Sequence, residues 1–169
     1  VPGENDETPE QRKRRKKTKG KPLLERENAI ALEKRKLTKE TCEKYDYFTS
    51  SDEIGKVQVA PYRDQSGRVT GQKVRGRGKR FYTTGDFSDV QLFGQHLWRK
   101  GGKRLLITEG EVDALSAYQI LGGSWPVVSL PSGAQSAVKA IKTNLEFVES
   151  YEQIILCFDM DEAGQEAAK

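Results

Sequence analysis

From residue 103 onward, short apolar segments alternate with amphipathic ones, and this alternation constrains the fold more than any other feature of the chain. The apolar segments have the length of strands, and the segments between them have the apolar spacing of helices. Strands that alternate with helices pair in parallel, because each helix carries the chain back by a right-handed crossover. We therefore predict an α/β unit with a parallel βαβαβα sheet. Its strands are expected over 104–108, 125–130 and 153–158, and its helices over 111–121, 134–147 and 162–169.

Residues 46–85 have a different pattern, which predicts a small antiparallel sheet. Valine and aromatic residues lead into the turn sequence of 63–68, and residues 69–74 form the return strand. A second turn, centred on 76–78, leads to a further strand over 81–84. The parallel sheet is thus expected to follow a small antiparallel β/α subdomain.

The tip of this predicted antiparallel sheet is strongly basic and is followed by two aromatic residues. Alternate residues of a strand share one face, so Lys73, Arg75 and Arg77 are expected to line up. Positive charge binds phosphate, and an aromatic ring offers a surface on which a base can stack. This favours binding of single-stranded nucleic acid or a nucleoside triphosphate; an exposed hairpin kept in solution by its charge is the alternative. The cluster consists of Lys73, Arg75, Arg77, Lys79 and Arg80, next to Phe81 and Tyr82.

The first 36 residues are expected to be a linker or basic arm. Residues 1–20 combine prolines, acids and a run of basic residues, which is typical of a disordered segment. Such a segment is either a plain tether or an arm that contacts phosphates without specificity. The apolar spacing over 23–36 predicts a helix, and residues 37–45 predict a second one with Thr38 as its N-cap. Residues 37–102 are then one subdomain and residues 103–169 another.

Charge is divided unevenly along the chain. Residues 103–169 carry 5 basic and 10 acidic groups, whereas the residues before them carry 24 basic and 15 acidic groups. This asymmetry suits a polyanion held by one half and a cation held by the other. No apolar run approaches the ~20 residues needed to cross a bilayer, and no signal-peptide pattern opens the chain. A cytoplasmic protein without membrane contact is expected. The two cysteines, Cys42 and Cys157, form neither a zinc-ligand set nor a disulfide framework.

Acidic residues stand at the carboxyl ends of the first and third predicted parallel strands, where such sheets bind ligands. Glu109 follows the first strand and Asp113 lies in the next helix, while Asp159 and Asp161 follow the third strand. Clustered carboxylates repel one another and favour a bound cation, and oxygen ligands suit Mg²⁺ or Mn²⁺. We predict that these four residues form a metal site. An ordinary helix N-terminal acid at Asp161 and a surface acid at Asp113 are the alternatives.

These motifs resemble those of a known fold. Glu109-Gly110-x-x-Asp113, followed by Asp159-x-Asp161 after a βαβαβ stretch, is similar to the TOPRIM fold of primases, topoisomerases and some nucleases. Residues 37–169 further resemble the primase half of the bifunctional primase–helicases of short-tailed phages. The segments that carry this second resemblance are 37–42, 62–67, 72–75, 93–98 and 158–164.

The resemblance implies a DNA primase, a Mg²⁺- or Mn²⁺-dependent nucleotidyltransferase that makes short RNA primers on single-stranded DNA from ribonucleoside triphosphates. It implies catalytic roles for Glu109, Asp159 and Asp161, and it implies phosphate or template contacts for the basic cluster. It also implies a zinc-binding module and a ring helicase domain elsewhere in the full-length chain, since neither set of motifs is present here. The alternatives are a TOPRIM nuclease or another phosphodiester enzyme, and a non-catalytic module that binds single-stranded DNA and is attached to a replicative helicase. If the protein is phage-encoded, it is expected in the host cytoplasm.

Overall fold

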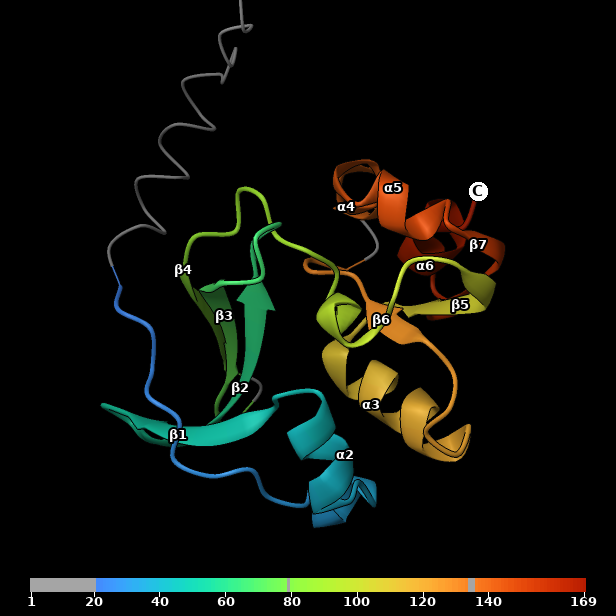
Figure 1. Cartoon of the computed structure of the whole chain (residues 1–169). Coiled ribbons are helices and arrows are strands. Elements are labelled where there is room, and N and C mark those ends of the chain that lie inside the picture. Colours follow the sequence, from blue (N-terminus) through green and yellow to red (C-terminus); the bar gives the residue numbers. More distant parts are fainter. Residues whose placement is uncertain (1–20, 79, 134–135) are drawn as a thin grey trace, which may run out of the picture.

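Two sheets lie side by side in the computed structural model, which describes residues 21–78, 80–133 and 136–169 (Figure 1). The first half of the chain forms an antiparallel sheet and the second half a parallel one, which confirms the predicted fold class. The predicted arm over 1–20 lies outside the described residues, as does Lys79 of the basic cluster. Within the described ranges, no helix has the length and apolar character that would let it cross a bilayer.

The antiparallel sheet has four strands in the order β1-β2-β3-β4. The predicted hairpin and the strand after it are confirmed as β2, β3 and β4. Strand β1 was not predicted, because its sequence FTSSD contains mostly polar residues and shows little apolar alternation. One face of the sheet is closed by a small core of Phe48, Val57, Val59 and Val74. The strand bounds are Phe48–Asp52 for β1, Gly55–Arg63 for β2, Val69–Arg75 for β3 and Phe81–Gly85 for β4.

The parallel sheet has three strands in the order β6-β5-β7, so the strands that carry the predicted acidic residues are neighbours. The strand and helix alternation is confirmed, with one difference: the helix predicted over 134–147 is divided at Asn144. The buried Asn144 amide donates to the carbonyl oxygens of Val90 and Ala140, and this accounts for the break. The bounds are β5 Gly102–Thr108, α3 Glu111–Ile120, β6 Val127–Ser129, α4 Ala137–Thr143, α5 Leu145–Val148, β7 Tyr151–Cys157 and α6 Glu162–Ala167.

The helix predicted over 23–36 is wrong. Its only helical part is a 3₁₀ turn, η1 (Glu33–Arg35), because the backbone before it bonds to the antiparallel sheet instead. Leu24 exchanges two hydrogen bonds with the Gln72 side chain, and Asn28 pairs with Thr49 of β1. The second predicted helix is confirmed as α2 (Lys39–Lys44), and Thr38 caps it by accepting from the Thr41 amide at 3.2 Å.

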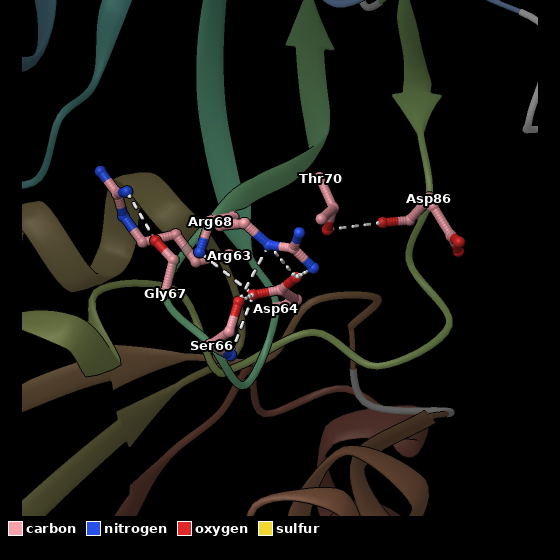
Figure 2. A network of polar contacts seen from close by, with 7 residues as sticks. All are labelled: Arg63, Asp64, Ser66, Gly67, Arg68, Thr70 and Asp86. Carbon is pink, nitrogen blue, oxygen red and sulfur yellow. Dashed lines mark hydrogen bonds and ion pairs between the residues drawn. The ribbon is translucent and has the colours of Figure 1, made fainter.

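The turn between β2 and β3 is built around the carboxylate of Asp64 (Figure 2). One oxygen accepts from the Ser66 amide at 2.9 Å and from the Ser66 hydroxyl at 2.6 Å. The other accepts from the Arg68 guanidinium at 3.0 Å. These bonds to the charged form, with the one from the Ser66 hydroxyl contributing most, lower the pKa of Asp64 to about 2.

This turn predicts a pH dependence of stability. Because the pKa of Asp64 is lower in the folded state, its contribution is present above pH ~4 and is lost as the pH falls from about 4 towards 2. Urea unfolding at pH 5 and pH 3 should show that Asp64→Asn loses less free energy of unfolding over this interval than the wild type. Glu53→Gln, at an exposed acid, should follow the wild type. Parallel pH curves for all three proteins would contradict the assignment.

A shared aromatic core joins the two sheets. The Phe93 ring packs against the rings of Tyr45 and Tyr62, and its centroid lies 5.7 Å from the centroid of each. Phe93 also pairs by backbone with Ser129 of β6. The chain can approach the Tyr45 ring here because the next residue, Gly94, has no side chain: its φ is 81°, and a Cβ would lie 2.5 Å from the ring.

Gly94→Ala should therefore lower the free energy of unfolding, and Gly67→Ala is the matched control for the contact with the Tyr45 ring. Gly67 has a similar φ of 86° but has open space around the position of a Cβ. Both substitutions impose backbone strain, and only Gly94→Ala also displaces a buried ring. Its loss in free energy of unfolding should exceed that of Gly67→Ala by about 1–3 kcal/mol. Equal losses in chemical denaturation would show that the contact with Tyr45 relaxes freely.

Candidate functional site

The acidic residues predicted at the carboxyl ends of β5 and β7 lie next to one another. Asp159 donates its backbone N–H to the Glu109 carboxylate at 3.3 Å. The loop after β6 also reaches this edge, since a Cβ on Gly133 would lie 3.7 Å from the other Glu109 carboxylate oxygen. The three strands of the parallel sheet therefore all end around Glu109.

Asp113 shares the electrostatics of this edge from the start of α3. Loss of hydration at its carboxyl group raises the pKa of Asp113, although the residue as a whole is exposed, and the charge of Asp159 raises it further. Arg35 of η1 acts in the opposite direction. Asp113 is thus close enough to Asp159 for their charges to interact.

Asp161 has a structural task as the N-cap of α6. One of its carboxylate oxygens accepts from the Gly164 amide at 2.8 Å. The alternative that Asp161 is an ordinary acid at a helix N-terminus is therefore correct for part of its role. A metal-binding role for Asp161 remains a prediction.

The described side chains do not form a finished metal centre: in 21–78, 80–133 and 136–169, no three carboxylate, histidine or cysteine groups converge closely enough to hold an ion. The donor chemistry nevertheless fits a hard divalent cation. Glu109, Asp113 and Asp159 supply only oxygen atoms, and their like charges repel.

Lys73 of the basic cluster contacts this acidic region through a residue that the sequence analysis missed. Its ammonium lies 2.6 Å from the carboxylate of Glu111, the first residue of α3. The same carboxylate oxygen accepts a hydrogen bond from the buried hydroxyl of Tyr62. Glu111 thus ties β2 and β3 to the helix that carries Asp113. Its position between Glu109 and Asp113 was visible in the sequence, but its partners are 38 and 49 residues away.

The other members of the basic cluster have different surroundings. Lys73 and Arg75 alternate on β3 as predicted, while Arg77 lies beyond the strand, in the exposed turn. Arg80 is held by Asp52, with 2.8 Å between guanidinium and carboxylate. The Arg75 guanidinium stacks over the Phe81 ring at 4.9 Å from its centroid. The cluster is therefore divided between structural pairs and groups that face solvent.

A groove of about 550 Å³ lies beside this cluster. It lies between the segment around η1 and the antiparallel sheet. One of its lining residues, Arg35, interacts electrostatically with Asp113. Three cationic side chains along a groove suit an anionic ligand. The groove was not predicted, because the apolar spacing of the sequence indicates a long helix that includes residues 30–35. Its lining residues are Ile30, Ala31, Leu32, Glu33, Lys34, Arg35, Gln58 and Arg75.

An antiparallel sheet that precedes a parallel one with an acidic edge defines a TOPRIM-type α/β protein, and family models agree. Residues 106–169 match the Toprim-like family. Residues 28–85 match the family described as bacteriophage T7 DNA helicase/primase, N-terminal α+β fold. The first match covers most of the parallel sheet, and the second covers the antiparallel sheet.

Individual relatives identify the family. The DNA helicase/primase of Enterobacteria phage T3 is 46% identical over 138 residues, which are 82% of this chain and 24% of that protein. The primase fragment of the bacteriophage T7 primase–helicase superposes with a TM-score of 0.76 at 43% identity, covering 87% of this chain and 66% of that one.

A second T7 structure shows lagging-strand DNA polymerase interacting with primase domains bound to an RNA/DNA hybrid. It matches with a TM-score of 0.77 and 47% identity over 83% of this chain and 71% of that one. The chain belongs to the primase part of the phage primase–helicase family, and it spans about a quarter of the length of the curated T3 relative.

The acidic edge predicts opposite effects of one substitution with and without metal. Asp159→Asn removes one of the repelling charges, so its melting temperature in EDTA should rise by on the order of 2–4 °C. Added Mn²⁺ should raise the melting temperature of the wild type but raise that of Asp159→Asn less. Asp89→Asn, the same change at an exposed residue, should behave as the wild type. An equal Mn²⁺ shift in all three proteins would count against a metal site at this edge.

Proposed function

We propose that this chain is the catalytic core of a DNA primase, which synthesises short RNA primers on single-stranded DNA from ribonucleoside triphosphates. The observation that carries the proposal is the contact of Glu109 with the Asp159 backbone at the ends of adjacent parallel strands, next to a basic groove. Family membership supports it. The zinc-binding module and the ring helicase domain are proposed to lie elsewhere in the full-length protein.

In the proposed reaction, the 3′-hydroxyl oxygen of the growing RNA attacks the α-phosphorus of the incoming triphosphate, and pyrophosphate leaves. Glu109, Asp159 and Asp161, with Asp113 beside them, would hold Mg²⁺ or Mn²⁺. The bound cation would lower the pKa of the hydroxyl and offset the charge that develops on the phosphates. Glu109 is the candidate acceptor of the hydroxyl proton.

The basic residues would bind the phosphate groups of the substrates, which the acidic residues repel. Arg75 and Arg35 line the groove and would contact phosphates of the triphosphate or the template. Arg77 in the adjoining turn, and Lys79, which lies outside the described residues, are proposed to contact phosphates as well. Lys73 is paired with Glu111 at 2.6 Å, so its contribution requires that a phosphate compete with this carboxylate. Arg80 is held by Asp52 and would act mainly by shaping the turn.

Primer extension tests the proposal without the zinc-binding module. A short RNA annealed to single-stranded DNA is supplied with ribonucleotides and Mg²⁺ or Mn²⁺. Extension is expected, and Glu109→Gln should reduce its rate by at least about 100-fold, since loss of general base catalysis alone has effects of this order. Glu149→Gln makes the same change at an exposed residue before β7 and should keep the wild-type rate.

The same assay separates the alternatives. A shortened template would indicate the nuclease. Strand binding without extension or cleavage, and unaffected by Glu109→Gln, would indicate a non-catalytic binding module.

A further inference from the structure

We propose that Phe81, backed by Arg75, is a stacking platform for a base of the single-stranded template. The proposal rests on the proposed function, because it names a contact for that template. It assigns a role to an aromatic ring that packs into neither sheet's core.

The platform lies on the side of the antiparallel sheet from which Lys73 contacts Glu111, the first residue of α3. Phe81 of β4 pairs directly with Arg75 of β3, and Arg75 pairs with Gln58 of β2, so the three side chains form one row across the sheet. Gln58 and Arg75 line the groove. Lys73, two residues from Arg75 and therefore on the same face, reaches α3. Phe81 thus extends the groove towards the sheet edge.

The neighbouring aromatic residue on β4, Tyr82, has a structural role and provides a comparison for Phe81. Tyr82 points to the opposite face, packs against the core of Val59 and Val74, and donates its hydroxyl to Asp52 at 2.7 Å. Phe81 is 60% exposed. One exposed aromatic residue is ordinary on a protein surface. The stacked cation and the adjoining groove are what distinguish Phe81.

The geometry suits one nucleotide unit. The Arg75 guanidinium lies over the Phe81 ring, 4.9 Å from its centroid, and in such a stack the N–H groups at its rim can donate to a phosphate. Arg77 lies in the exposed turn between the two strands. A base can therefore stack on the ring while its backbone phosphates meet Arg75 and Arg77. Such stacking tolerates any base, because every base has an aromatic face.

Fluorescence provides a direct test. In Phe81→Trp the new indole should be quenched when an unlabelled oligodeoxynucleotide binds, while an abasic strand with the same phosphates should not quench it. Ile120→Trp, at an 82% exposed position on α3, should show no quenching with either strand and measures the background from Trp98 and Trp125. Strand binding without quenching of Phe81→Trp, or equal quenching by the abasic strand, would overturn the platform.

Affinity measurements complete the test. By fluorescence anisotropy, Phe81→Ala should weaken binding of a labelled strand by on the order of 10-fold, whereas Phe81→Tyr should retain it. Ile54→Ala, at a 76% exposed apolar residue beside β1, should have no effect. Quenching of Phe81→Trp by ribonucleoside triphosphates but not by the strand would overturn the assignment to the template.

The two proposals fail separately. Quenching and affinity loss without primer extension would overturn the primase activity and leave the platform standing. If Phe81→Ala extends the primer at the wild-type rate and Phe81→Trp binds the strand without quenching, only the platform would be overturned.

Discussion

Aromatic packing between the two sheets is the contact on which the rest of the structure depends. Phe93 packs against both Tyr45 and Tyr62, and Tyr45 donates its hydroxyl to the Val127 carbonyl of β6 at 2.8 Å. Neither sheet could bury this face alone, because the antiparallel sheet supplies Tyr62 and the parallel sheet supplies the surface under Phe93. The packing fixes the distance between the basic face and the acidic edge. It is therefore the constraint that makes a two-sided site possible.

Glu111 adds an electrostatic tie across the same interface. A carboxylate at the first turn of a helix is favoured by the helix dipole, and here it also accepts from Tyr62 and Lys73. It lies two residues from both Glu109 and Asp113, so one side chain links β2 and β3 to the segment that carries these acidic residues. The side chains of the Lys73–Glu111 pair are only 29% and 16% exposed, which makes solvent screening weaker than at the surface.

Local patterns predicted most of the elements, and long-range contacts explain where those predictions failed. The strand and helix alternation after residue 103, the cap at Thr38 and the two hairpin turns depend on neighbouring residues, and they were predicted correctly. The segment around Leu24 is extended because Gln72, 48 residues away, binds its backbone. Glu111 was missed for the same reason. The division into subdomains at residues 36 and 102 stays a prediction.

The basic cluster shows why composition alone could not assign its residues. Arg75 and Arg80 are both arginines beside an aromatic ring, and their guanidiniums lie 4.9 and 5.4 Å from the ring centroids of Phe81 and Tyr82. Asp52 neutralises Arg80 and accepts from Tyr82, so this pair is completed within the protein. Arg75 has a ring as its neighbour and a groove in front of it. The Asp52 carboxylate beside Arg80 and the groove beside Arg75 therefore distinguish the structural pair from the pair that we propose for a ligand.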